Sequence, residues 1–175
     1  YAGQKARQFS ARENFVSDCI SLLDGGTNLL AIRGQSGTGK STLMARLAQV
    51  LQDRGHQVLP IFCSTTPLCN NSLDLVKYII DDLEDRLGLP HFATQPRNGQ
   101  PTEQEWVDRL EDLVAAYNAQ EKGRLIILID GVDQLFADQG REKLRFVPYN
   151  LSTKVQMVVS CLSEFHLGRP MAVQV

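Results

Sequence analysis

Short apolar runs alternate along this chain with longer stretches in which apolar residues recur every three or four positions. Alternation of strand-length runs with helical stretches is typical of an α/β fold whose sheet is mostly parallel. The apolar runs predict strands at Asn28–Arg33, Val58–Phe62, Leu125–Ile129, Val155–Ser160 and Met171–Val175. We therefore expect one α/β domain over residues 1–175.

The stretches between these runs predict helices, which begin at Phe9, Ser41, Ser72 and Thr102. Ser10 with Glu13, and Thr102 with Glu105, have the spacing of a capping box, in which two side chains satisfy backbone amides at the start of a helix. The segment Gly88–Pro101 holds three prolines and no apolar periodicity. It is therefore expected to be a long, flexible surface loop.

The first predicted strand leads directly into a segment that satisfies the pattern G-x-x-x-x-G-K-[ST]. A polyphosphate carries several negative charges, and a loop binds them when successive backbone N–H groups point inward, which glycines permit. The helix that follows adds the positive end of its dipole. We predict a phosphate-binding loop (P-loop) made of Gly34, Gln35, Ser36, Gly37, Thr38, Gly39, Lys40 and Ser41.

The polar side chains at the end of this loop have separate predicted roles. Lys40 supplies a mobile cation for the β- and γ-phosphates, and the Ser41 hydroxyl is a ligand for Mg²⁺. Thr42 either caps the helix or reaches the α-phosphate. The competing interpretation is a glycine-rich turn that matches by chance, but a strand before the loop and a helix after it are the setting that the motif requires.

The most apolar predicted strand ends in a carboxylate, Asp130. A buried strand of a parallel sheet delivers its last residue to the carboxyl edge, where α/β folds bind ligands. Beside a P-loop, we expect Asp130 to hold Mg²⁺ largely through the water molecules that this ion retains. The alternative is an Asp that caps the next turn with the help of Gly131.

A second carboxylate, Asp133, follows three residues later. It either orients or deprotonates the water that attacks the γ-phosphate, or forms the N-cap of the next helix. Gln134 stands where a stronger hydrolase often has Glu, and its amide positions water but does not accept a proton. We therefore expect slow hydrolysis of a nucleoside triphosphate bound with Mg²⁺ at this loop.

Three segments together resemble the NACHT group of STAND NTPases, signal-transducing switches related to AAA+ proteins. They are Phe9-x-x-Arg12-Glu13, the P-loop, and the sequence Leu-Ile-Asp-Gly-Val-Asp that ends at Asp133. The likeness covers nearly the whole chain, and the Asp-Gly-hydrophobic-Asp sequence discriminates better than the P-loop, which many families share.

The resemblance implies a three-layer fold with a five-stranded sheet in the order 5-1-4-3-2. It also implies ATP and ADP with Mg²⁺ as ligands, and a switch between a closed ADP state and an open, self-oligomerising ATP state. Such domains lie between an effector domain and a sensor of repeats, and serve in innate immunity, cell death or defence against phage. Phe9 and Arg12 would then lie near the adenine and ribose, whereas the capping box alone explains Ser10 and Glu13.

One feature departs from this family. Its members often carry an Arg just after the fourth strand that senses the γ-phosphate, but Ser160–Ser163 offers only hydroxyls and a thiol. Arg169 lies too far along the chain to fill that place.

Other classes of function compete with the switch. A small-molecule or nucleotide kinase needs an Arg-rich lid, and Gly88–Pro101 contains only Arg97. A guanine-specific switch needs Asn/Thr-Lys-x-Asp after the fourth strand, and Ser160–Arg169 has none. A scaffold that binds ATP without turnover remains open because of Gln134.

Composition narrows the setting. The net charge is −2 with no block of like charges, which argues against a nucleic-acid surface, and no apolar run approaches the length of a membrane span. The four cysteines lack metal-type pairing and are expected to be reduced thiols of a cytoplasmic protein, with a disulfide between Cys63 and Cys69 as the alternative. Because the chain begins at Tyr1, we expect a fragment of a larger multidomain protein.

Overall fold

The computed structural model of the chain describes residues 2–63, 71–96, 99–136, 147–162 and 171–174, with the side chains of residues 2–12, 136 and 171–174 left out. Its elements follow the alternation predicted from the apolar pattern. The α-helices are α1 (Ala2–Asp24), α2 (Lys40–Asp53), α3 (Ser72–Leu87) and α4 (Glu103–Ala119). The strands are β1 (Leu29–Arg33), β2 (Gln57–Phe62), β3 (Leu125–Asp130), β4 (Val155–Cys161) and β5 (Met171–Gln174), and the 3-10 helices are η1 (Phe92–Thr94) and η2 (Val132–Phe136).

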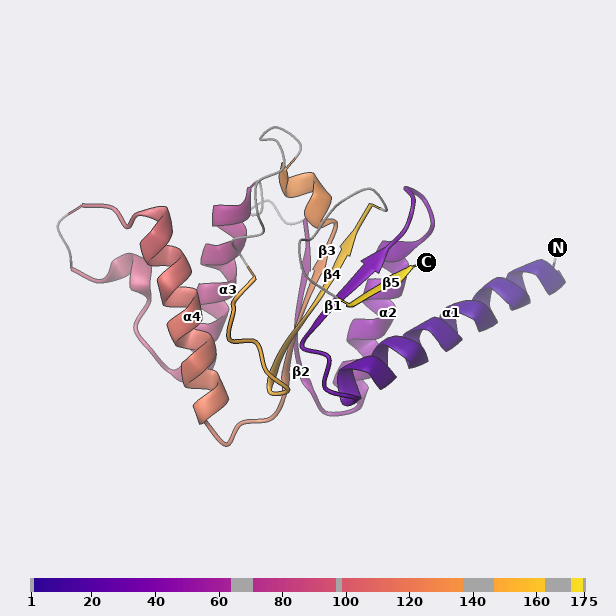
Figure 1. Cartoon of the computed structure of the whole chain (residues 1–175), viewed down its shortest axis with the longest axis horizontal. Helices are drawn as coiled ribbons and strands as arrows, with labels where there is room; N and C mark the ends of the chain where they lie inside the picture. Colours follow the sequence, from indigo (N-terminus) through magenta and orange to yellow (C-terminus); the bar gives the residue numbers. More distant parts are fainter. Residues whose placement is uncertain (1, 64–70, 97–98, 137–146, 163–170, 175) are drawn as a thin grey trace.

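The strands form one parallel sheet in the order β2-β3-β4-β1-β5 (Figure 1). The parallel α/β architecture and the 1-4-3-2 order of β1 to β4 confirm that part of the prediction. β2 and β3 are joined through α3 and α4, a long crossover of the kind that parallel neighbours need. All the strands therefore end at the same edge of the sheet, the carboxyl edge.

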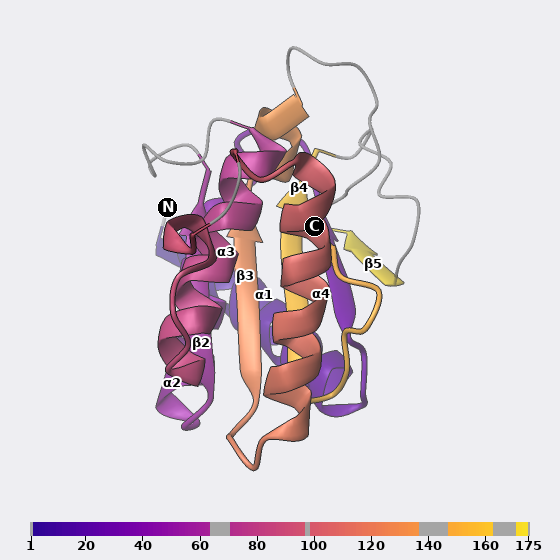
Figure 2. The ribbon, with the colours of Figure 1, turned by 90° about the vertical axis from the view of Figure 1, so that its left-hand side faces the viewer.

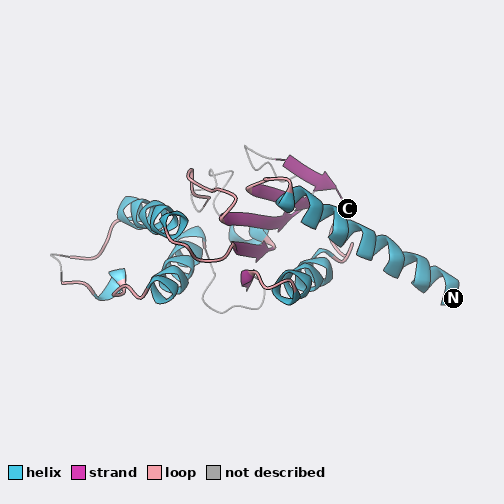
Figure 3. Ribbon diagram, turned by 90° about the horizontal axis from the view of Figure 1, so that it is seen from below, coloured by secondary structure: helices cyan, strands magenta, loops and turns pink. Residues whose placement is uncertain are grey.

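Helices cover both faces of the sheet (Figure 3). Alternate residues of each strand point to opposite faces, so Ala31 packs into a core with α3 and α4, while Leu30 and Ile32 pack into a second core with α1 and α2. α3 and α4 lie side by side over β3 and β4 (Figure 2). β3 and β4 are buried along their whole length, which explains their continuous apolar sequences.

The start of α1 differs from the prediction. The helix begins at Ala2 rather than at Phe9, so Ser10 and Glu13 lie in its interior and do not form an N-terminal capping box. The residues before Phe9 are mostly Ala, Gln, Lys and Arg, which favour a helix, and they extend the element towards the N-terminus. Glu13 instead accepts a hydrogen bond from Arg46 of α2, 3.1 Å between Oε1 and Nε.

The remaining predicted helix starts are close to the observed ones. Thr102 and Glu105 form the predicted capping box at α4. At α3 the side chain of Asn71, one residue before the predicted start, accepts a hydrogen bond from the Asp74 amide at 2.9 Å. None of the helices in the described part of the chain combines the length and apolar content needed to cross a bilayer.

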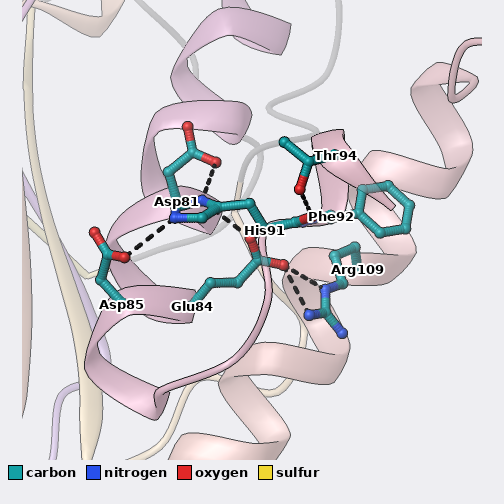
Figure 4. A network of polar contacts seen from close by, with 7 residues as sticks. All are labelled: Asp81, Glu84, Asp85, His91, Phe92, Thr94 and Arg109. Atoms are coloured by element: carbon teal, nitrogen blue, oxygen red, sulfur yellow. Dashed lines mark hydrogen bonds and ion pairs between the residues drawn. The ribbon is translucent and has the colours of Figure 1, made fainter. Parts of the chain in front are cut away.

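A charged network fastens the loop after α3 to the two helices beside it (Figure 4). Glu84 of α3 is fully buried, and its Oε1 accepts hydrogen bonds from Nε and Nη2 of Arg109 on α4 at 2.9 and 2.7 Å. Its Oε2 accepts the backbone amide of Phe92 at 3.0 Å. The Phe92 ring packs edge-on against Trp106 of α4, with 5.0 Å between ring centroids. Part of the predicted surface loop is therefore packed against both helices.

His91, just before η1, lies against the carboxylates of α3 in this network. Its Nδ1 is 3.3 Å from Oδ1 of Asp81 and its Nε2 is 3.2 Å from Oδ1 of Asp85. The hydrogen bond to Asp81 and the charges of Asp85, Asp81 and Glu84 raise the pKa of His91 above its ordinary value of 6.5.

We predict that the contribution of His91 to holding this loop against α3 depends on protonation of its imidazole ring. Because the folded-state pKa is raised, the stabilisation is present below the ordinary imidazole pKa of 6.5 and is lost as the pH rises through the raised value. His56 is an internal control, since burial and then the charge of Arg124 lower its pKa. An NMR titration of the imidazole resonances is expected to place the His91 midpoint above that of His56. The reverse order would contradict the assigned contacts.

Candidate functional site

The P-loop connects the carboxyl end of β1 to the start of α2. Gly34 is buried, and its amide donates to the carbonyl of Cys161 on β4 at 3.3 Å, which holds the entry of the loop against the sheet. The residues from Gln35 to Thr38 are exposed. Gly37 and Gly39 have φ angles of 79° and 90°, in the left-handed region that glycine adopts without strain. The sequence pattern is thus accompanied by the strand, the left-handed loop and the helix that the motif requires.

Lys40 closes this loop through its side chain. Its Nζ donates to the backbone carbonyls of Gly34 at 2.8 Å and Gln35 at 2.9 Å, so the ammonium group lies against the entry of the loop. The hydroxyl and the amide of Thr38 also point to the Gln35 carbonyl, at 2.9 and 3.4 Å. These contacts place one positive charge at the loop that the dipole of α2 also makes positive.

The first turn of α2 presents two exposed hydroxyl residues, Ser41 and Thr42. The N-cap of α2 is Gly39, which has no side-chain hydrogen bond to the helix, so Thr42 is not the capping residue. Ser41 directly follows Lys40 and lies where the motif requires a hydroxyl ligand for Mg²⁺. Its exposure leaves that hydroxyl accessible.

Asp130 ends β3 at the same edge of the sheet. It is 5% exposed, and its Oδ1 accepts a hydrogen bond of 2.5 Å from the hydroxyl of Ser160 on β4. The Ser160 oxygen in turn accepts the backbone amide of Gly131 at 2.9 Å. Ser160 therefore links the carboxylate of Asp130 to the turn that follows it, and leaves Oδ2 without a hydrogen bond in the described part of the chain.

The contact between Ser160 and Asp130 was not predicted from the sequence. Ser160 was noted there only as one of the hydroxyl residues found where the family often has an Arg. The contact arises because β3 and β4 are paired so that Ile129 lies opposite Val159. Asp130 and Ser160 each follow one member of that pair, so their side chains emerge next to each other on one face. The available signal was two polar residues at the ends of two apolar strands, but their adjacency depends on the strand order.

The turn after Asp130 brings Asp133 to the end of β4. Gly131 has a φ of 77°, in the left-handed region that glycine adopts without strain, so the backbone angle calls for glycine here. A Cβ would also lie 2.9 Å from Nε2 of Gln134, but that is the far end of an exposed side chain that can move aside. Asp133 lies within η2, and its Oδ1 accepts the backbone amide of Leu162 at 3.1 Å. Its predicted role as the cap of a following helix is not observed, because η2 already begins at Val132.

The strand order sets the separation between the P-loop and Asp130. β4 lies between β1 and β3, so the two sites stand two strand spacings apart, or about 10 Å. The two predicted Mg²⁺ ligands, Ser41 at the start of α2 and Asp130 at the end of β3, thus belong to the same edge of the sheet. Mg²⁺ keeps several waters, so two protein ligands of this kind are enough to hold it beside a phosphate. The donor set, one hydroxyl and one carboxylate, consists of the oxygen ligands that Mg²⁺ prefers.

Several predicted residues cannot be placed at this site. The side chains of Phe9 and Arg12 lie outside the described residues, and so do Arg97, Arg169 and Cys69. The contact of Phe9 and Arg12 with adenine and ribose stays a prediction, as does the alternative disulfide between Cys63 and Cys69. Cys19 and Cys161 carry free, buried thiols, and burial raises the pKa of Cys19 to about 12.

Comparison with known proteins identifies a family. The model of the AAA ATPase domain matches residues 10–159, which include the P-loop, Asp130 and most of β4. No match was found among curated proteins. The matched segment covers most of the chain, and the fold and the P-loop geometry agree with it. The chain therefore belongs to the AAA ATPase domain family of P-loop nucleotide-binding proteins.

Proposed function

We propose that this domain is an ATP-dependent switch that binds Mg-ATP at the P-loop, hydrolyses it slowly and controls self-association through its nucleotide state. The observation that carries the proposal is the meeting of the P-loop with Asp130 at one edge of the sheet. An exposed glycine-containing loop, an ammonium group and a buried carboxylate are together suited to a magnesium-bound polyphosphate. Membership of the AAA ATPase domain family supports nucleotide binding and hydrolysis.

The roles of the chain's own residues follow from their geometry. The residues from Gln35 to Thr38 are exposed, and we propose that their backbone amides bind phosphate oxygens, with the Thr38 amide giving up its long contact of 3.4 Å to the Gln35 carbonyl. Lys40, which donates to carbonyls of the loop itself, exchanges these contacts for the β- and γ-phosphates. When bound, Mg²⁺ neutralises the charge that develops on the phosphates, and Ser41 and Asp130 would hold it. Ser160 keeps the Asp130 carboxylate oriented.

Slow turnover is supported by the groups near the attacking water. Asp133 already accepts the Leu162 amide through one oxygen, which lowers its availability as a general base. Gln134 is exposed and carries an amide that orients water without accepting its proton. This arrangement is consistent with a switch in which ATP stays bound for a long time before it is hydrolysed. It also suits a scaffold that binds ATP without turnover, which is the second candidate.

The wider setting of the switch is proposed from the resemblance to NACHT-type STAND proteins. In this view the chain is one NTPase domain of a larger cytoplasmic protein, with an effector domain on one side and a sensor on the other. Self-oligomerisation in the ATP state would bring effectors together, as in immune, cell-death or anti-phage signalling.

The P-loop assignment predicts that Lys40→Ala weakens binding of Mg-ATP by at least about tenfold, because a charge-assisted contact to phosphate is lost. Isothermal titration calorimetry measures the affinity. Lys77→Ala is a matched control, since Lys77 on α3 lies against the Trp106 ring and away from the P-loop. Equal ATP affinity in wild type and Lys40→Ala would show that the loop does not bind phosphate.

The magnesium assignment predicts that Asp130→Asn removes most of the dependence of ATP binding on Mg²⁺, because the amide carries no charge for the ion. ATP affinity is measured over a series of Mg²⁺ concentrations. Asp112→Asn on α4 is the control for loss of one carboxylate. An unchanged magnesium dependence would place the metal elsewhere.

The slow-switch assignment predicts that Asp133→Asn lowers the single-turnover rate of ATP hydrolysis by about 10²-fold or more, as expected for loss of a group that orients or deprotonates water, with ATP affinity unchanged. Rapid mixing with excess enzyme measures this rate. A wild-type protein that binds ATP but forms no ADP would favour the scaffold, and an unaltered rate in the variant would exclude Asp133 from the reaction.

A further inference from the structure

Arg33 occupies an unusual place for a positively charged residue. It is the last residue of β1, directly before Gly34, and pairs in register with Cys161 of β4. Alternation along β1 places its side chain on the same face as Ala31, the face covered by α3 and α4. The residue is half-buried. A guanidinium group is thus held at the carboxyl edge, beside the start of the P-loop.

No carboxylate of the described residues forms an ion pair with Arg33. Its Nε is buried and has no hydrogen-bond partner among the described residues, as is also true of the Nε of Arg124, whose guanidinium group nevertheless pairs with Asp24. Other half-buried arginines are paired: Arg86 with Asp82, Arg109 with Glu84, and Arg124 with Asp24. A buried donor without a hydrogen bond costs free energy, and a half-buried charge without an opposite charge beside it is a candidate for contact with an anionic ligand.

The surroundings of Arg33 are those of the nucleotide site. The Cys161 thiol beside it is fully buried, and burial raises the pKa of this thiol. The charge of Asp133 adds to the increase, whereas the charges of Arg33 and Lys40, and a side-chain hydrogen bond with Arg33, oppose it. One buried atom is therefore within electrostatic range of Arg33, Lys40 and Asp133 together. The Gly34 amide also donates to the Cys161 carbonyl, which ties the end of β1 to the end of β4.

We propose that Arg33 contacts the γ-phosphate of bound ATP and makes the site distinguish ATP from ADP. The inference rests on the proposed function, because it assigns a further residue to the same site. The terminal phosphate is expected above the end of β4, between the P-loop and Asp130. Arg33 ends the adjacent strand, about 4.8 Å away in the sheet. ADP has no group at that position and leaves Arg33 without its partner.

The planar guanidinium group suits this task. It binds phosphate oxygens with two parallel hydrogen bonds, whereas an ammonium group offers a single point of charge. Contact with the γ-phosphate satisfies the buried donor and neutralises the charge together, so the ATP state gains contacts at the end of β1 that the ADP state lacks. The family resemblance predicts an Arg at the end of β4. In this chain that place is held by Cys161, and Arg33 lies beside it in register at the end of β1.

The test compares ATP and ADP affinity in wild type, Arg33→Gln and Arg33→Lys by calorimetry with Mg²⁺ present. Arg33→Gln is expected to weaken ATP binding by about tenfold, the size of one charge-assisted contact, and to change ADP binding by less than about twofold. Arg33→Lys keeps the charge but not the two parallel hydrogen bonds, so its ATP affinity is expected to lie between those of wild type and Arg33→Gln.

Arg54→Gln is the matched control. Arg54 is the C-cap of α2, at the end of a helix about 21 Å long that starts at Lys40, and it pairs with Asp24 at 3.5 Å. This variant removes the same charge and is expected to leave both affinities unchanged. Thermal unfolding of each variant shows whether it folds, and if Arg33→Gln does not fold, Arg33→Lys alone decides the question through its ATP-to-ADP affinity ratio.

The outcomes separate this inference from the proposed function. If wild type binds neither ATP nor ADP, the proposed function fails. If wild type binds both and the ATP-to-ADP affinity ratio is unchanged in Arg33→Gln and Arg33→Lys, only the role of Arg33 is overturned. Equal weakening of both nucleotides in a folded variant also overturns it, because a structural role does not depend on the γ-phosphate. A selective loss of ATP affinity supports it.

Discussion

The position of β4 between β1 and β3 is the constraint on which this site depends. Parallel pairing places Ser160 opposite Ile32 on one side and next to the end of β3 on the other. The P-loop and Asp130 lie far apart in the chain, but this strand holds them about two strand spacings apart at one edge. A different strand order would leave each motif intact and separate them. Nucleotide binding is therefore a property of the sheet as well as of the loop.

The hydrogen bond between Ser160 and Asp130 shows how a polar pair is kept inside an apolar sheet. Both side chains are almost fully buried, at 0% and 5% exposure, in strands whose other residues are mostly apolar. A carboxylate in this position is costly unless its oxygens are hydrogen-bonded or bind a cation. Ser160 satisfies one oxygen, and a cation at the other would complete the set. The Asp130 carboxylate thus both stabilises the strand end, through its hydrogen bond with Ser160, and provides the proposed ligand for the metal.

The buried charges between α3 and α4 are paired with each other and stabilise the fold, unlike the positive charges at the carboxyl edge. Glu84 and Arg109 join α3 to α4 and fasten the backbone of Phe92, far along the chain from the P-loop. There each buried charge has an opposite charge beside it. At the carboxyl edge, Lys40 lies on backbone carbonyls and Arg33 has no carboxylate partner among the described residues. This excess of positive charge is consistent with an anionic ligand.

Local patterns in the sequence determined the strand positions, the start of α2 and the capping box of Thr102, because each depends on residues a few positions apart. The start of α1 was misplaced, since favourable helix propensity before Phe9 outweighs a capping box at Ser10. Only the tertiary structure decided that Ser160 binds Asp130, that Asp133 binds the Leu162 amide and that Arg33 lies beside Cys161. These contacts join segments that are far apart in the chain and meet at the ends of neighbouring strands, so they depend on strand order and register, which no local pattern encodes.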